Sequence, residues 1–356
     1  MSCTAILVNY FSAADTAGAV KSLLDDDSSL TVVVVDNSCS RVESDALVAA
    51  LPSTVRVLIS SENLGFGRAC NWAVDKSDSE FIFLLNPDAR VLPGCIARLI
   101  GQLKLSNGLG AVAPMQYLDD ACHWMLPPSW FPTEIRAWAG EIALRDRDVA
   151  RKLSRASRKE AVRYWTSVSP ISQRALSGGM LMIRRSAIEA SSPLFDPRFF
   201  MYFEDSDLCR RLKRRGCTFA MVPSAKGVHR WRNQSHKDQM MAKSAVLYFD
   251  KYTSANARWH KKTAELLKEE MLTPLLGNYI AFPTDGIDLS PGKWLCELSP
   301  SPLMSPAIGS IIDGSHFGFP AEVIGNFEGA PLFARIGPLT CSSEEDNCRY
   351  FKLNRS

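Results

Sequence analysis

Short apolar runs alternate with stretches of helical spacing along the first part of the chain. The apolar runs predict strands over residues 4–10, 31–36, 55–60, 80–85 and 110–114. Apolar positions at helical spacing predict helices over residues 13–24, 67–76 and 93–105, the last with Pro93 in its first turn. Strands and helices that alternate in this way are typical of a parallel α/β sheet. The run at 31–36, Thr-Val-Val-Val-Val-Asp, is dense enough in β-branched residues for a strand buried on both faces.

The middle and the end of the chain have different patterns. Residues 134–163 hold nine Lys or Arg against five acids, with apolar residues between them, which predicts a solvated helical excursion or an amphipathic surface facing a membrane. A long helix is predicted over residues 236–271. After Gly277, frequent Gly and Pro separate short apolar runs. We therefore expect a large α/β domain over residues 1–275, with a helical, basic insertion at about 120–165, and a small β-rich module of unknown role over residues 278–356.

The composition narrows the class of protein. The chain has 356 residues, with 41 Lys and Arg against 38 Asp and Glu, and a formal net charge of +3. Its 46% hydrophobic and 22% charged residues are near the globular average, which excludes a disordered, collagenous or disulfide-scaffold protein. The small net charge argues against nucleic acid as the main partner. No apolar run approaches the ~20 residues that cross a bilayer, and the N-terminus lacks the basic start of a signal peptide, so we expect a cytoplasmic protein.

Polar residues follow the ends of successive predicted strands, where α/β sheets bind ligands. They are Asn9-Tyr10, Asp36-Asn37, the run Glu62-Asn63-Leu64-Gly65-Phe66-Gly67-Arg68, and Asn86-Pro87-Asp88. Any one of them could merely cap a helix or form a turn, but a series at one sheet edge favours a binding site. Asp88 is the best metal candidate, because a carboxylate in a proline-stiffened turn suits Mg²⁺ or Mn²⁺. Gly65-Phe66-Gly67 is a poor dinucleotide fingerprint, since Cys70 stands where its last small residue belongs.

A second group of acids lies far along the chain from the first. Glu204, Asp205 and Asp207 open a predicted helix, directly after five aromatic residues between positions 195 and 203. Acids are favourable at a helix N-terminus, and Asp207 can pair with Arg211 one turn later. A purely structural role for the acids leaves the five aromatic residues unexplained. If these aromatics surround a carboxyl with apolar groups, its pKa rises towards the value useful for a general base. Upstream, Ser177-Gly178-Gly179 forms either a plain turn or a close approach to a ligand, and His229 alone is more typical of a structural histidine.

Taken in order, these segments resemble family 2 glycosyltransferases, and among them the rhamnosyltransferase-like branch that builds bacterial surface polysaccharides. The matching stretches are Val8-Asn9-Tyr10, Val35-Asp36-Asn37, the run from Asn63 to Asn71, Leu85-Asn86-Pro87-Asp88-Ala89, Ser177-Gly178-Gly179 and the run from Phe200 to Leu208. Together they cover roughly residues 3–250. The resemblance implies the GT-A fold, a Rossmann-like α/β fold with a mostly parallel central sheet and flanking helices. It also implies an inverting transfer from a nucleotide-diphosphate sugar.

The resemblance further implies roles for single residues. The nucleotide-sugar site would comprise Asn9, Tyr10, Asp36, Asn63, Gly67, Arg68, Asn86, Ser177, Gly178 and Gly179. Asp36 is similar to the family residue that reads the base or ribose. Asp88 matches the last acid of the DxD-type metal motif, with Asn86 in place of the first acid, and His229 resembles a histidine that completes the site for Mg²⁺ or Mn²⁺. Asp205, with Glu204 beside it, falls on the acid pair that supplies the catalytic general base.

The implied function is the transfer of a sugar to a glycan or lipid-linked acceptor, with L-rhamnose from dTDP-rhamnose as the favoured donor. Peripheral association with the cytoplasmic face of the inner membrane and a homo-oligomer are both compatible with the sequence. Two alternatives remain open: a non-catalytic nucleotide-sugar or glycan-binding protein, and a nucleotidyltransferase. Residues 10–18 contain no Lys or Arg and so lack the basic loop expected of a nucleotidyltransferase.

Overall fold

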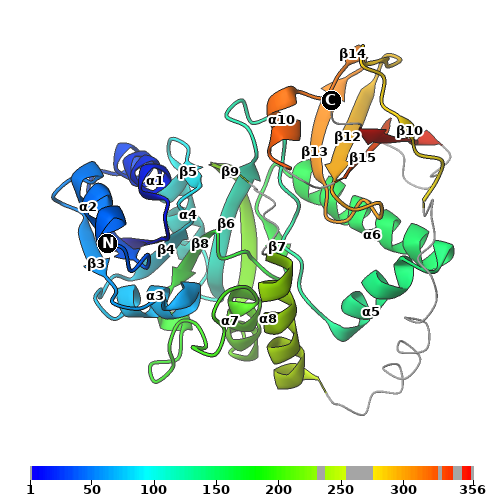
Figure 1. The fold of residues 1–356 in the computed structure, drawn as a ribbon. Helices are drawn as coiled ribbons and strands as arrows, with labels where there is room; N and C mark the ends of the chain where they lie inside the picture. The colour runs from blue at the N-terminus through cyan, green and yellow to red at the C-terminus, as the bar shows by residue number, and fades with distance from the viewer. Residues whose placement is uncertain (1, 231–236, 254–275, 328–330, 340–346, 354–356) are drawn as a thin grey trace.

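A nine-stranded sheet forms the centre of the larger part of the molecule (Figure 1). The computed structural model describes residues 2–230, 237–253, 276–327, 331–339 and 347–353. The strands are β1 (Cys3–Asn9), β2 (Thr31–Asp36), β3 (Arg56–Ile59), β4 (Phe81–Leu85), β5 (Ala89–Val91), β6 (Leu109–Tyr117), β7 (Ile171–Gln173), β8 (Met180–Arg184) and β9 (Thr218–His229). They run in the order β3-β2-β1-β4-β8-β6-β9-β5, with β7 also paired to β9. Strands β1 to β4 and the pair β6–β9 are parallel, whereas β5, β7 and β8 pair antiparallel with their neighbours.

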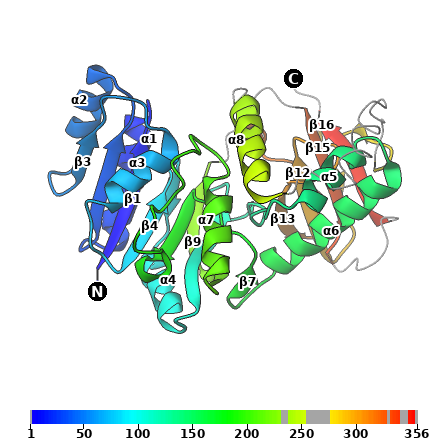
Figure 2. The ribbon, with the colours of Figure 1, turned by 90° about the horizontal axis from the view of Figure 1, so that it is seen from below.

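Helices cover both faces of this sheet (Figure 2). On one face lie α1 (Ala13–Asp26), α2 (Arg41–Ala50) and α4 (Cys95–Lys104), and on the other lie α3 (Gly65–Val74) and α7 (Glu204–Arg214). Because consecutive strand residues face opposite sides, Val32 and Val34 of β2 pack in one core and Val33 and Val35 in the other. The predictions of a mostly parallel α/β sheet and of a strand buried on both faces are therefore confirmed.

Some element boundaries differ from the predicted ones. Helix α2 was not predicted, although Ser40 caps it by accepting the Glu43 N–H, the pattern of a capping box. Helix α4 begins at Cys95, because Gly94 adopts a left-handed φ of +79° at the N-cap, so Pro93 precedes the helix rather than lying in its first turn. The helix expected over 236–271 begins as α8 (Lys237–Tyr252), and residues 254–275 lie outside the described part of the chain. A short 3₁₀ helix (Arg185–Ala187) follows β8.

The C-terminal part forms a second sheet, as its β-rich pattern predicts. Its strands are β10 (Ile280–Ala281), β12 (Lys293–Ser299), β13 (Ile308–Asp313), β15 (Leu332–Pro338) and β16 (Arg349–Leu353), in the order β10-β16-β15-β12-β13. Strands β11 (Ile287–Asp288) and β14 (His316–Phe317) form a separate pair, and α10 (Ala321–Gly325) follows them. Within the described ranges, every helix is too short or too polar to cross a membrane.

Helices α5 (Glu134–Ala143) and α6 (Arg147–Trp165) lie beside this second sheet (Figure 1). The Trp165 indole donates to the Leu126 carbonyl over 2.8 Å and packs against Gly309 of β13, where a Cβ would collide with the ring. Met115 of β6, Trp165 of α6 and Leu295 of β12 share one hydrophobic core. One side of the basic segment is therefore buried, so the segment is not simply a solvated excursion. The division into residues 1–275 and 278–356 stays a prediction.

A buried group of charges fastens α6 to the second sheet. Glu297 of β12 accepts two hydrogen bonds of 2.7 Å from Arg335 of β15, and one from Arg158 of α6. Arg335 also donates to Ser154 of α6 over 2.7 Å. Burial alone would raise the pKa of Glu297, but the two guanidinium groups outweigh it and hold that pKa below its ordinary value. The charges are thus paired where water does not reach them.

Replacing Arg335 by Met is expected to lower the free energy of unfolding by about 3–5 kcal/mol, because Glu297 would lose its bidentate partner in a buried site. Denaturant unfolding at neutral pH measures this loss. The pKa of Glu297 is depressed on folding, so its contribution is present above the unfolded carboxyl pKa and is lost as the pH falls through the folded value. The difference in unfolding free energy between wild type and R335M should therefore become smaller at acidic pH. R41M, which changes an exposed arginine, is the control, and equal stability of both variants would contradict the prediction.

Candidate active site

The carboxyl ends of β1 and β2 are joined by buried polar side chains. Asn9 donates to Asp36 Oδ1 over 3.2 Å and to Glu43 Oε1 of α2 over 3.0 Å. Asp36 also accepts from the Ser38 N–H over 3.1 Å and from the Ser44 hydroxyl. Burial raises the pKa of Asp36, but these hydrogen bonds outweigh it and hold the pKa below its ordinary value. Asn9 and Asp36 are both fully buried, so in this structure they brace the sheet edge from inside.

The segment after β3 brings a later loop against the same edge. Asn37 donates to Asn63 Oδ1 over 2.9 Å, which fixes the turn into α3. Gly65 has a left-handed φ of +72°, and any Cβ there would collide with the Phe200 carbonyl. A Cβ on Gly67 would lie 3.2 Å from the Phe195 Cβ. The two glycines therefore let the loop over residues 195–203 pack directly on the start of α3.

Two of the predicted nucleotide-sugar residues lie at the surface of this edge. The Tyr10 side chain is 53% exposed, and its ring meets the ring of Phe11 edge-on at a centroid distance of 4.9 Å. The Arg68 guanidinium pairs with Glu62 over 2.9 Å, and both side chains are largely exposed. These groups are accessible to a ligand, in contrast to Asn9 and Asp36.

A second polar group forms where β4, β5, β6 and β9 meet. The antiparallel pairing of β5 with β9 sets Ala89 opposite His229 and so brings Asp88 to the histidine. His229 Nε2 lies 3.3 Å from Asp88 Oδ1 and 3.4 Å from Asn86 Nδ2. On the other side of the ring, Nδ1 lies 3.1 Å from Gln116 Oε1 of β6. The structure therefore brings together Asn86, Asp88 and His229, although His229 follows Asp88 by more than a hundred residues.

This group has the chemistry of part of a divalent-cation site. Two ligand atoms about 2.1 Å from one cation and at right angles to each other stand about 3 Å apart, close to the observed 3.3 Å between Asp88 and His229. Metal-binding histidines use their second nitrogen to hold a neighbouring polar group, as His229 does with Gln116. In the described ranges, no group of three or more His, Cys, Asp and Glu is placed to hold a metal. The remaining coordination positions of a cation bound here would suit phosphate oxygens and water, the usual ligands of Mg²⁺.

Asp205 is held in a fixed orientation at the start of α7. Its Oδ2 accepts the Gly178 N–H over 3.1 Å, and its Oδ1 accepts the Ser206 N–H over 2.6 Å. Burial raises the pKa of Asp205 above its ordinary value, although the hydrogen bonds oppose this shift. Tyr202 and Phe203 directly before the helix both have left-handed φ values, +68° and +65°, a conformation that non-glycine residues adopt at a cost of about 1–3 kcal/mol each. The chain therefore accepts backbone strain where it presents this carboxylate.

Glu204 has a different environment from its neighbour. Its side chain is buried, and its Oε2 has no hydrogen-bond partner among the described residues. Burial, and then the charge of Asp205, raise the pKa of Glu204 to about 8. Asp205, in contrast, is partly exposed. Of the two predicted catalytic acids, Asp205 is the one that a bound molecule could reach.

Replacing Glu204 by Gln is expected to make the protein less sensitive to alkaline pH. A carboxyl whose pKa is raised on folding contributes stability that is complete below its unfolded pKa and is lost as the pH rises through about 8. Gln cannot ionise, so the melting temperature of E204Q should rise relative to wild type between pH 6 and pH 9. E322Q, at an exposed glutamate of α10, should show no such trend, and a constant difference for E204Q would overturn this prediction.

Ser177-Gly178-Gly179 connects the two groups of acids. The Gly178 N–H binds Asp205, and the Ser177 hydroxyl accepts the Gly179 N–H over 3.4 Å. A Cβ on Gly179 would lie 2.7 Å from His229 Cε1 and 3.0 Å from Asn86 Nδ2. The candidate base therefore binds Gly178, and the candidate metal ligand His229 lies against Gly179, whose Cα is only about 3.8 Å from that of Gly178.

Gly179→Ala is expected to lower activity at least about tenfold more than Gly178→Ala. The added methyl group at 179 would clash with the His229 ring and with Asn86, which would have to shift. A Cβ at 178 meets its nearest neighbours, Phe66 and Asp205, at the ordinary contact distances of 3.5 and 3.6 Å. Steady-state rates at several cation concentrations measure the difference. G178A keeps the N–H that binds Asp205 and is the matched control. If both variants lost the same activity, the contact at Gly179 would have no special role.

Some residues of the site were not predicted. Gln116 was detectable as a polar residue within the apolar run of β6, Ala-Val-Ala-Pro-Met-Gln-Tyr. The left-handed Tyr202 and Phe203 have no signal in the sequence. Asp207 is fully buried and accepts from Arg211 over 2.8 Å, which confirms the predicted Asp207–Arg211 pair within α7. Asp207 also accepts from Tyr252 of α8 over 2.5 Å, and this bond anchors α8 to α7.

The chain is similar in sequence to known proteins. Residues 4–163 match the family model described as Glycosyl transferase family 2. Two curated relatives carry the same name, N-acetylglucosaminyl-diphospho-decaprenol L-rhamnosyltransferase, in Mycobacterium tuberculosis strains CDC 1551 / Oshkosh and ATCC 25618 / H37Rv. Each is 29% identical over 223 residues, which is 59% of this chain and 69% of the relative.

Two solved structures are also similar. GalNAc-T7 with UDP, GalNAc and Mn²⁺ aligns with a TM-score of 0.46 and 14% identity over 64% of this chain and 43% of that one. The mannosyltransferase PcManGT from Pyrobaculum calidifontis, in complex with GDP-Man and Mn²⁺, aligns with a TM-score of 0.49 and 15% identity over 74% of this chain and 68% of that one. The sheet and the family match confirm the predicted GT-A type of α/β fold. Residues 4–163 are thus similar to glycosyltransferase family 2, and together with the curated relatives they identify this protein as a glycosyltransferase.

Proposed function

We propose that the protein transfers a sugar, with L-rhamnose from dTDP-rhamnose as the favoured donor, to a lipid-linked or glycan acceptor in bacterial surface polysaccharide synthesis. The curated relatives, which are named for rhamnosyl transfer to a diphospho-decaprenol acceptor, support this choice of donor and acceptor. The catalytic domain would be residues 1–275. The donor would lie along the edge formed by the exposed Tyr10 and Arg68, over the bracing pair Asn9 and Asp36.

In this proposal Asp205 is the general base. The Gly178 and Ser206 N–H groups orient its carboxylate, and partial burial raises its pKa towards a value useful for proton abstraction. Asp205 takes the proton from the acceptor hydroxyl while that oxygen bonds to the anomeric carbon. The bond to the diphosphate oxygen breaks on the opposite face of the sugar, and the anomeric configuration is inverted. The transition state resembles the oxocarbenium-like one of glycoside hydrolysis.

Asp88 and His229 would hold a divalent cation, Mg²⁺ or Mn²⁺. When bound, such a cation neutralises charge that develops on the leaving diphosphate. Asn86 and Gln116 keep the His229 ring in place, and Gly179 leaves the space that the ring occupies. Because Asn86 replaces the first acid of the metal motif, more of the coordination falls to the diphosphate and to water.

The observation that carries the proposal is that Asp205 accepts the Gly178 N–H while the His229 ring lies against the next residue, Gly179. The test is to incubate the full chain with dTDP-rhamnose and other nucleotide sugars, with Mg²⁺ or Mn²⁺, with and without a polyprenyl-diphosphate-linked acceptor. We expect nucleotide release that requires both cation and acceptor. Donor binding without turnover under any condition would instead favour a nucleotide-sugar-binding protein.

A further inference from the structure

The outer side of α6 is a continuous basic surface. Six of its cationic residues are exposed: Arg147, Arg151, Lys152, Arg155, Lys159 and Arg163. Five of them are spaced four residues apart. At 3.6 residues per turn, each step turns the side-chain direction by about 40°, so the five span an arc of about 160° around the helix axis. The only acid on that arc is Asp148 in the first turn. We call these six side chains the α6 basic face.

The opposite side of α6 is fully used by the fold. Ala150, Ser154, Ala161, Tyr164 and Trp165 are buried. The remaining basic residue, Arg158, points inward to Glu297, and the one acid in the second half of the helix, Glu160, pairs with Arg136 of α5 over 3.3 Å. The apolar side of α6 is therefore buried in the fold, and a membrane contact of α6 would not involve insertion of that side. The basic face must act through charge.

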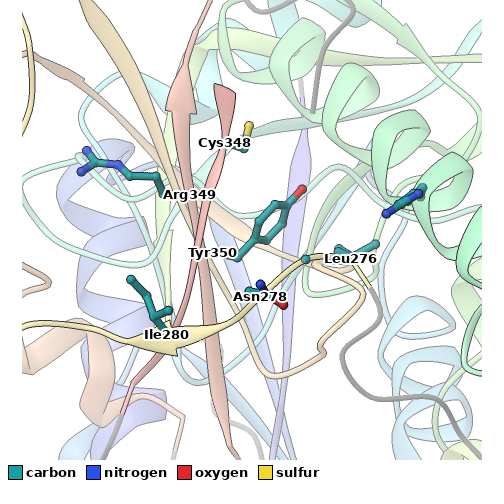
Figure 3. A pocket seen from close by; sticks show the side chains of 8 residues that line it. Leu276, Asn278, Ile280, Cys348, Arg349 and Tyr350 are labelled. Carbon is teal, nitrogen blue, oxygen red and sulfur yellow. The ribbon is translucent and has the colours of Figure 1, made fainter. Parts of the chain in front are cut away.

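A pocket opens beside the N-terminal half of the α6 basic face (Figure 3). It has a volume of about 410 Å³, and Arg151 of α6 lines it together with Leu276, Asn278, Ile280 and Tyr350. A space of this size is in the range of small-ligand sites. It gives a phosphate headgroup room to sit beside Arg151 instead of only above the helix.

We propose that the α6 basic face docks the enzyme on an anionic membrane surface, with lipid phosphate groups against its guanidinium and ammonium groups. Charge complementarity supports this occupant, because each Lys or Arg close to an anionic leaflet strengthens binding by roughly fivefold, and the attraction fades within a Debye length of about 8–10 Å. Six cations on one side of one helix, with a single acid among them, suit a flat anionic surface. The inference deepens the proposed function, since a lipid-linked acceptor lies at such a surface.

Vesicle cosedimentation of the full chain tests the docking. Vesicles of phosphatidylcholine alone are compared with vesicles that also contain about 30% phosphatidylglycerol, in low and in physiological salt. We expect salt-sensitive binding to the anionic vesicles only. The triple variant R147E/R151E/K159E should lose at least about 100-fold of that partitioning, from roughly fivefold for each cation removed. Neither donor nor acceptor is needed, so the result is independent of whether the protein transfers sugar.

The control carries the same change of charge elsewhere. K21E/R41E/K104E reverses three basic residues on α1, α2 and α4, and should keep vesicle binding within about threefold of wild type. Should the α6 triple variant unfold, the single neutral changes R151Q and K159Q should each still weaken binding several-fold. The proposal is overturned if wild type binds both kinds of vesicle equally, or if the two triple variants lose binding to the same extent. Binding to heparin but not to anionic vesicles would likewise overturn it.

Discussion

Asp205→Asn is expected to lower the rate of sugar transfer by about 100- to 10,000-fold, the usual contribution of a positioned general base. Asn fills nearly the same volume and its one amide oxygen can still accept the Gly178 N–H, although its NH2 group cannot accept the Ser206 N–H. Asn cannot take a proton from the acceptor. The loss should therefore appear in kcat, with donor affinity little changed. Steady-state kinetics combined with calorimetric titration of the donor would separate the two quantities.

Two further variants make the Asp205 result specific. E204Q should retain most of the activity near neutral pH, because the raised pKa of Glu204 already keeps that carboxyl largely protonated there. D313N, at an exposed aspartate of the C-terminal sheet, should be indistinguishable from wild type. If E204Q lost as much activity as D205N, or if D205N remained fully active, the assignment of the base to Asp205 would be wrong.

Asp88→Ala is expected to cost about 100-fold in rate and to raise the cation concentration needed for half-maximal activity. The change removes the Asp88 carboxylate, which lies 3.3 Å from His229 Nε2. The imidazole of His229 would then be the remaining one of the two side chains proposed to bind the cation. Calorimetric titration of Mn²⁺ in the presence of the nucleotide diphosphate measures the second effect directly.

His229→Gln should resemble Asp88→Ala in this titration, since both residues would act on the same ion. Asp75→Ala, at an exposed aspartate after α3, serves as the control and should leave the cation requirement unchanged. An Asp88→Ala enzyme with the cation requirement of wild type would contradict the proposed metal site.

The local part of this structure could be predicted from sequence because it depends on nearby residues. The run at 31–36 contains its own burial signal, and β2 has the predicted bounds. The local pattern also placed Asp36 and Asp88 at the ends of predicted strands and Asp205 at the start of a predicted helix. Helix α2 was missed although its Ser40–Glu43 capping signal is present, because its apolar stripe is short.

The rest depends on contacts between distant segments. The family resemblance placed His229 with Asp88, but the residues around position 229 alone do not, and nothing indicated Gln116 on the other side of the ring. The pairing of β9 with β5 and β6 brings the three together. The contrast between buried Glu204 and partly exposed Asp205 arises from the packing of α7, as does the strain at Tyr202 and Phe203. The basic segment at 134–163 could be read from its charges, but which of its sides is buried is decided by a sheet that begins more than a hundred residues later.

The anomeric configuration of the product is the most direct test of a single displacement with Asp205 as base. The full chain would be supplied with a nucleotide-diphosphate sugar of known configuration, a divalent cation and a lipid-linked acceptor, and the new linkage would be assigned by NMR. We expect one transferred sugar with a configuration opposite to that of the donor, formed about 100- to 10,000-fold more slowly by D205N. A product that retains the configuration of the donor would contradict the single displacement with Asp205 as base.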